Sequence, residues 1–167
     1  FSENLSENSN SKIISLQKIR TNMIESLKKR YIILTINLAV KTPFLIGAGI
    51  PSIDEIGFYW SRNYGIPIIP GTTIKGCFKS YLEEISKDNL EEIFGTEDKM
   101  GKAIFLDAIP LGKISLGIDF QTPHFQKYYM ENKPPNDVYN PVPLNFLHVN
   151  NGKFRLDILI DKQEDRI

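Results

Sequence analysis

The sequence has 167 residues, enough for one domain with an appendage, and its 41% hydrophobic and 24% charged residues are ordinary for a globular protein. Its 20 lysines and arginines balance its 20 aspartates and glutamates, whereas domains that bind nucleic acid alone usually carry a basic excess.

No apolar run reaches the roughly 20 residues that cross a bilayer, and no signal segment opens the sequence. Cys77 is the only cysteine, which excludes a multi-thiolate zinc site. We therefore expect a cytoplasmic protein with no cofactor and no metal.

The first part of the sequence predicts a tail followed by a helix. Residues 1–12 are mostly Ser, Asn and Glu with little to bury, so we expect a disordered tail. Over residues 13–30, apolar side chains recur at steps of three and four, which predicts an amphipathic helix. The helix ends in the basic run Lys28-Lys29-Arg30, which more often marks a solvated helix end than a binding patch.

A strand, a glycine-bearing loop and a second helix are predicted next. Apolar and polar residues alternate from Leu34 to Lys41, as in a strand with one buried face, and the loop Gly47-Ala48-Gly49 follows. Gly71-Thr72-Thr73 opens the helix, and a shorter helix near Asn89 to Phe94 stops at Gly95. The predicted buried stripe of the longer helix consists of Ile74, Phe78, Tyr81, Leu82 and Ile85.

The remainder of the sequence predicts four strands, over residues 103–109, 114–121, 144–149 and 154–161. Asn150-Asn151-Gly152 separates the last two, and Asn-Gly between alternating runs is a strong hairpin signal. This order of elements indicates an α+β fold, with an antiparallel sheet that carries helices on one face, in addition to the N-terminal helix.

The start of the Gly71 helix is the segment most informative about function. A helix N-terminus leaves about four backbone N–H groups without partners and carries a partial positive charge. Lys75 and Lys79 oppose that dipole unless an anion binds there, so phosphate is the expected guest. The alternative is a capped helix with two solvated lysines. Likewise, Gly47 and Gly49 could let a phosphate chain approach the backbone, or form only a turn.

A second group of interest follows the strand over residues 114–121. Histidine titrates near neutrality, so His124 could act as a general acid or base on RNA. The nearby aromatic residues Phe125, Tyr128 and Tyr129 could stack on exposed bases. No nucleophile or second base is evident beside His124, so a structural or RNA-contacting role is favoured over catalysis.

Four other residues with reactive side chains are expected to be structural. Asp107 and Asp119 fall on neighbouring strands and could form paired carboxylates, but solvent-facing or hydrogen-bonded roles are favoured. Cys77 lies near the apolar stripe of its helix, which predicts a small buried hydrophobe. His148 is interpreted as an ordinary strand residue.

Several segments, in one order from about Thr35 to Ile160, resemble the RAMP (repeat-associated mysterious protein) superfamily. The Pro-His-aromatic stretch ending in two tyrosines, followed by Pro-x-Pro-x-x-Phe-Leu, resembles in particular the sixth-subunit family of the type III-B CRISPR effector (Cmr) complex. The segments that carry the resemblance are residues 68–76, 93–95, 105–108, 119–129 and 141–147, together with the loop at 47–49.

The resemblance implies a ferredoxin-like (RRM-related) core in a single RAMP domain, residues 31–167. RAMP proteins typically carry a further glycine-rich loop near the C-terminus, so its absence here predicts truncation at that end. The implied function is that of a non-catalytic subunit that binds guide and target RNA and other RAMP subunits in antiviral defence. The alternative is a RAMP endoribonuclease that processes precursor guide RNA with His124 as general acid or base. The residues expected to contact RNA are Gly47, Gly49, Gly71, Thr72, Thr73, Lys75, Lys79, His124 and Tyr128.

Overall fold

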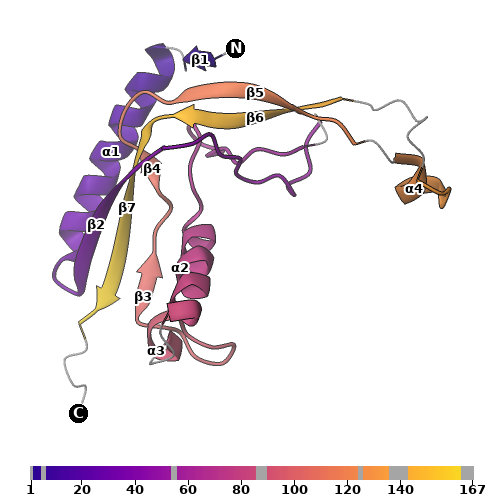
Figure 1. Cartoon of the computed structure of the whole chain (residues 1–167). Coiled ribbons are helices and arrows are strands. Elements are labelled where there is room, and N and C mark those ends of the chain that lie inside the picture. The colour runs from indigo at the N-terminus through magenta and orange to yellow at the C-terminus, as the bar shows by residue number, and fades with distance from the viewer. Residues whose placement is uncertain are drawn as a thin grey trace.

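The structure, a computed structural model, describes residues 2–4, 7–53, 56–85, 90–123, 126–135 and 143–162. It is a mixed α+β protein with an N-terminal helix, α1 (Glu7–Leu27), as predicted, but its antiparallel strands form two sheets rather than the single sheet expected (Figure 1). In the larger sheet, β7 (Lys153–Asp161) lies between β2 (Tyr31–Ala39) and β3 (Ala103–Phe105), and the two-residue β4 (Ile109–Pro110) also pairs with β7. None of the helices in the described ranges combines the length and apolar character needed to cross a membrane.

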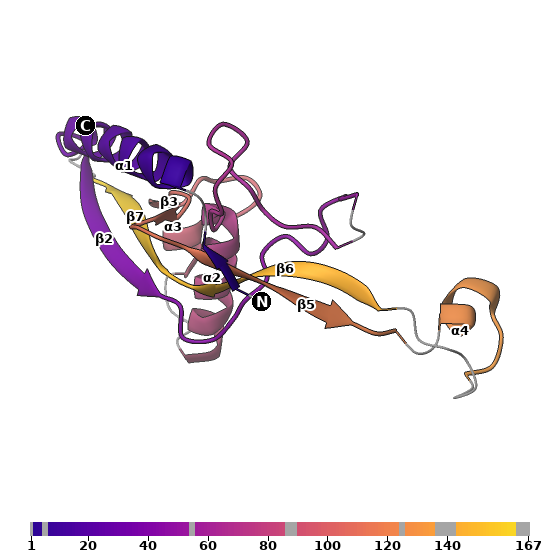
Figure 2. The ribbon, with the colours of Figure 1, turned by 90° about the horizontal axis from the view of Figure 1, so that it is seen from above.

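The smaller sheet has the order β1-β5-β6 and forms a long ribbon. Its strands are β1 (Ser2–Asn4), β5 (Ser115–Gln121) and β6 (Leu144–Asn151). The β5–β6 pair extends away from the helices, and α4 (Gln126–Glu131) lies beyond its far end (Figures 1 and 2). The predicted hairpin at Asn151-Gly152 is wrong, because β6 pairs with β5 whereas β7 pairs with β2 and β3. Gly152 is instead a corner at which the chain passes from one sheet to the other.

The N-terminal segment differs from the disordered tail predicted for residues 1–12. Ser2–Asn4 pairs with β5, and α1 begins at Glu7 rather than near residue 13. The reason is tertiary packing: Ile13 is 1% exposed and packs in a small apolar cluster with Ile66, Ile68 and Ile109. Burial of this side chain fixes the first turns of α1 against the core, which composition alone does not reveal.

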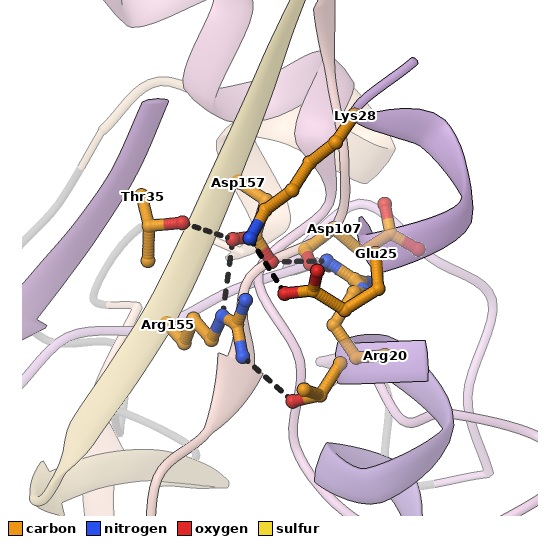
Figure 3. A network of polar contacts seen from close by, with 8 residues as sticks. Arg20, Glu25, Lys28, Thr35, Asp107, Arg155 and Asp157 are labelled. Atoms are coloured by element: carbon orange, nitrogen blue, oxygen red, sulfur yellow. Dashed lines mark hydrogen bonds and ion pairs between the residues drawn. The ribbon is translucent and has the colours of Figure 1, made fainter. Parts of the chain in front are cut away.

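The helices occupy both faces of the larger sheet. Phe154, Leu156 and Ile158 of β7 share the main core with Ile74 of α2 (Gly71–Ile85). Phe105, which lies opposite Ile158, stacks on Phe94 of α3 (Leu90–Phe94), so α2 and α3 lie on the same face. Asp157, whose side chain alternates to the other face, contacts α1 (Figure 3). The larger sheet therefore lies between α1 on one side and α2 with α3 on the other.

The predicted buried stripe of α2 is largely uncovered. Ile74 is buried, but Phe78, Tyr81 and Ile85 are 39%, 61% and 62% exposed. Cys77, also predicted to be buried, is exposed. On the same sheet face, Leu34 was predicted to point into the core and is 47% exposed. Phe78 still contacts Phe105 of β3, with ring centroids 5.8 Å apart, whereas Tyr81 and Ile85 are more open to solvent.

Candidate nucleic-acid interface

Two of the predicted site segments meet in one hollow of about 440 Å³, which we call the loop groove. One wall is the end of β2 with the segment that follows it, and the other is the first turn of α2. Gly47 and Thr73, which are distant in the sequence, both line it. The lining residues are Leu38, Ala39, Val40, Lys41, Thr42, Phe44, Leu45, Ile46, Gly47, Ile69, Thr73 and Phe154.

The loop groove has an apolar floor and a polar rim. Phe154 is fully buried at its base, and Phe44 packs edge-on against it with ring centroids 6.2 Å apart. Among the lining residues that the structure describes, the polar side chains are Lys41, Thr42 and Thr73, all exposed, and no carboxylate is present. An apolar floor suits the faces of bases and riboses, while a cation and hydroxyl groups at the rim suit phosphate oxygens.

The loop wall of the groove is held in a defined shape. Phe44 and Val149 exchange two backbone hydrogen bonds of 3.0 and 2.9 Å, which attach the loop to β6. Gly47 has φ 84°, a conformation that favours glycine, and its carbonyl accepts a bond of 2.9 Å from the Ile50 N–H. A Cβ at Gly47 would also stand 3.1 Å from the Tyr59 nitrogen. The glycine therefore forms a turn, and that turn shapes the groove.

The start of α2 is partly occupied by the protein itself. Gly71 is buried, and its N–H donates to Asp107 Oδ1 at 2.8 Å. Asp107 thus has the hydrogen-bonded structural role predicted for it. In the described part of the chain, the backbone N–H groups of Thr72 and Thr73 have no protein partner. An external anion at this helix start would therefore approach the two threonines rather than Gly71.

A buried carboxylate connects this helix start to the rest of the fold (Figure 3). Asp157 is 0% exposed and accepts bonds from Thr35 Oγ1 at 2.7 Å, Arg155 Nε at 3.0 Å and Arg20 Nη1 at 3.3 Å. Arg20 also donates through Nη2 to the carbonyl of Asp107 at 3.0 Å. One polar network therefore links α1, β2 and β7 to the residue that caps α2.

Lys79 lies in a different and partly acidic hollow. This hollow, of about 650 Å³ between α2 and α3, is lined by Lys79 together with three glutamates, and Lys79 Nζ is 3.9 Å from Glu83 Oε1. The side-chain hydrogen bond from Lys102 holds the pKa of Glu92, one of those glutamates, below its ordinary value. Lys75 is one turn before Lys79 and about 200° around the helix from Thr73. The two lysines therefore face away from the loop groove.

The other predicted RNA contacts are not gathered in the loop groove. Gly49 does not line it, and a Cβ at Gly49 would meet nothing within 4 Å. Tyr128 lies on α4, beyond the far end of the β5–β6 ribbon, with its ring 5.2 Å from that of Tyr129 (Figure 1). His124 lies outside the described residues. Within the described ranges, no group of three or more His, Cys, Asp or Glu residues could hold a metal ion.

Two residues of the rim were not predicted as site residues. Lys41 was interpreted only as an outward residue of the strand, and Thr42 was not singled out. The available signal was their position: a cation and a hydroxyl group directly between the end of a strand and a glycine-bearing loop.

Most of the chain is similar to one protein superfamily. Residues 37–166 match the RAMP superfamily, and the chain belongs to this family. It is 26% identical, over an alignment of 196 residues, to the CRISPR system Cmr subunit Cmr6 of Pyrococcus furiosus, covering 77% of this chain and 56% of that protein. It is 32% identical over 119 residues to the Cmr6 subunit of Saccharolobus solfataricus, covering 67% of this chain and 42% of that protein.

A solved structure of a Cmr complex also contains a chain similar to this one. A chain in the cryo-EM structure of the Type III-B Cmr-beta bound to cognate target RNA superposes with a TM-score of 0.75 and 26% identity. The match covers 90% of this chain and 54% of that chain. Our chain therefore spans about half the length of the curated relatives that it matches. These matches confirm the predicted resemblance to the sixth-subunit family of the Cmr complex.

Proposed function

We propose that this protein is a non-catalytic RNA-binding and assembly subunit of the Cmr6 type in a type III-B CRISPR effector complex, acting in antiviral defence. Its ligands are the guide RNA and the target RNA, and its neighbours are other RAMP subunits in the cytoplasm. The observation that carries the proposal is the loop groove, which brings Gly47 and Thr73 together beside Lys41. The Cmr6 relatives and the RNA-bound Cmr-beta complex support it.

Within this proposal, residues 31–167 form one RAMP domain with a ferredoxin-like core. When α3, β4 and the ribbon are set aside, the remaining elements have the order β-α-β-β, namely β2, α2, β3 and β7. In the sheet, β7 lies between β2 and β3. This is the order of the first four elements in a β-α-β-β-α-β arrangement. The β5–β6 ribbon and α4 are then insertions between β3 and β7, which agrees with the way the ribbon extends beyond the larger sheet (Figure 1).

The groove suits a nucleic-acid backbone rather than a particular base sequence. Lys41 can pair with one phosphate, while the hydroxyl groups of Thr42 and Thr73 can bond phosphate or 2′-hydroxyl oxygens. The backbone N–H groups at Thr72 and Thr73 add the positive end of the helix dipole. Lys75 and Lys79 would contact only RNA that crosses to the α3 side of α2. The zero net charge agrees with a subunit that shares its RNA with neighbours.

The double variant Lys41→Gln/Thr73→Val is expected to bind single-stranded guide RNA about tenfold more weakly than the wild-type chain. The substitutions remove one charge-assisted and one neutral hydrogen bond to the backbone. The slope of log affinity against log salt is expected to fall by about 0.7, the value for one lost phosphate contact on a single strand. Fluorescence anisotropy of a labelled RNA over a salt series measures both quantities.

The double variant Lys75→Gln/Lys79→Gln serves as the comparison, because both lysines lie on the other side of the same helix. We expect it to change the affinity less than the groove variant does. A larger loss in the lysine variant would move the RNA to the α3 side of α2 and contradict the groove assignment. If the wild-type chain did not bind RNA, the remaining function would be that of a scaffold that contacts only proteins.

The alternative function is an endoribonuclease that uses His124 as general acid or base. Repeat-containing RNA is expected to remain intact during incubation with the wild-type chain. Cleavage by the wild type that disappears in His124→Ala would replace our proposal with the nuclease. Gel analysis of the RNA recovered from the binding samples distinguishes the two functions.

A further inference from the structure

A second hollow adjoins the loop groove at the end of β2. It has a volume of about 530 Å³, and Ala39 and Val40 line both hollows. Its other walls are the turn before β5 and the corner between β6 and β7. We call it the corner hollow, and its polar and glycine lining residues are Gly112, Lys113, Ser115, Asn151, Gly152 and Lys153.

The charge of the corner hollow is of one sign. Lys113 and Lys153 are exposed, and no aspartate or glutamate is among the lining residues that the structure describes. The α2–α3 hollow, by contrast, combines its lysines with the carboxylates of Glu83, Glu91 and Glu92. In a chain with zero net charge, two adjoining hollows whose described lining residues include lysines but no carboxylates form a local basic surface. Such a surface attracts a polyanion.

The backbone that presents these lysines is fixed. Val40 N–H donates to the Gly152 carbonyl at 3.0 Å, and Leu111 N–H donates to the Lys153 carbonyl at 2.8 Å. Ile114 is fully buried beneath the corner, where a Cβ on Gly152 would stand 2.3 Å from its Cδ1. The hollow thus forms without a ligand, so binding would not carry the cost of ordering this backbone.

We propose that RNA leaving the loop groove passes around the end of the β2–β7 pair and is held in the corner hollow. The inference rests on the proposed RNA-binding function and extends its site to residues that the sequence did not suggest. The ammonium groups of Lys113 and Lys153 pair with successive phosphates of the strand.

The remaining polar groups of the corner hollow suit ribose. The Ser115 hydroxyl can bond a 2′-hydroxyl group. Asn151 Oδ1 already accepts from the Gly152 N–H at 2.7 Å, which leaves its amide NH₂ as a donor. Because only RNA carries the 2′-hydroxyl, these contacts favour RNA over DNA of the same sequence.

The test is the double variant Lys113→Gln/Lys153→Gln in the full chain, with Lys18→Gln/Lys29→Gln as the matched control. Both pairs are exposed lysines, and both variants lose the same charge. The probe is a labelled single-stranded RNA long enough to reach both hollows. We expect the salt slope to fall by about 1.4 in the first variant, from two lost phosphate contacts. The control is expected to keep the wild-type slope, and both variants are expected to keep the wild-type melting temperature.

Equal salt slopes for the two variants would overturn the corner-hollow inference. If Lys41→Gln/Thr73→Val still bound RNA more weakly than the wild type in that case, the proposed function would stand, with an RNA site limited to the loop groove. Absence of RNA binding by the wild-type chain would contradict both proposals. Unchanged RNA affinity with poor incorporation of the first variant into a reconstituted complex would mean that a partner protein covers this surface, which also overturns the inference.

Discussion

Replacing Asp157 with alanine is expected to lower the free energy of unfolding by about 3–5 kcal/mol, the usual cost of removing one partner from a buried ion pair. The carboxylate is 0% exposed and accepts bonds from Thr35, Arg155 and Arg20. The side chains of Arg20 and Arg155 are only 11% and 17% exposed. The substitution would therefore leave two guanidinium groups without the Asp157 carboxylate and with little access to solvent. Domains of this size are typically stable by about 5–15 kcal/mol, so the loss is a large share of the total.

Urea denaturation followed by circular dichroism measures this effect. Asp119→Ala is the matched control, because Asp119 is exposed on the ribbon and its carboxylate accepts only from the adjacent Phe120 N–H among the described residues. We expect the control to cost less than about 1 kcal/mol. Equal losses for the two aspartates would show that the Asp157 network does not hold α1 and β2 on β7.

Gly71→Ala is the second substitution expected to have a large effect, a loss of about 3 kcal/mol, at the upper end for overpacking. A Cβ at Gly71 would stand 2.2 Å from the Phe105 carbonyl oxygen and 2.8 Å from its carbon. Both are backbone atoms at the end of β3, so they cannot rotate away. Movement of this backbone would disturb the 3.1 Å bond from the Leu106 N–H to the Asp157 carbonyl and the cap on Gly71.

Gly76→Ala, on the same helix, is the control for Gly71→Ala. A Cβ at Gly76 would meet nothing within 4 Å, and the residue is exposed in the helix interior. We expect it to stabilise the protein by roughly 0.5–1 kcal/mol, since alanine is the better helix former. Thermal and urea unfolding of both variants give the comparison. Similar changes for the two glycines would contradict the close packing of Gly71 on β3.

Much of the secondary structure could be predicted because it follows from local patterns. The alternation from Leu34 falls largely within β2, α2 begins at the predicted Gly71, and α3 ends directly before the predicted glycine at 95. Pairing was harder, because it depends on distant residues. Asn151-Gly152 indicates a turn but not the partner of each strand, and β6 pairs with β5. The α2 stripe likewise identifies an apolar face without identifying what covers it.

The candidate site could be predicted in its parts but not in its assembly. Gly47 and Thr73 were both identified from local chemistry, yet only the fold places them in one groove. Lys79 looked suitable because the sequence does not show that Glu83 and the glutamates of α3 surround it. Gly71 was predicted to contact RNA, although its close neighbour in the structure is the backbone of β3. The carboxylate of Asp107 accepts the hydrogen bond from the first N–H group of α2. Because Asp107 is distant in the sequence, no local pattern predicts this contact.

Photo-crosslinking would show where bound RNA lies on the chain. Guide RNA substituted with 4-thiouridine would be bound to the wild-type chain, irradiated and digested, and the modified residues mapped by mass spectrometry. We expect adducts on both walls of the loop groove, in the segment from Lys41 to Gly47 and at Thr72 or Thr73. Adducts confined to the α2–α3 hollow around Lys79 and Glu83, with none on the loop groove, would contradict it.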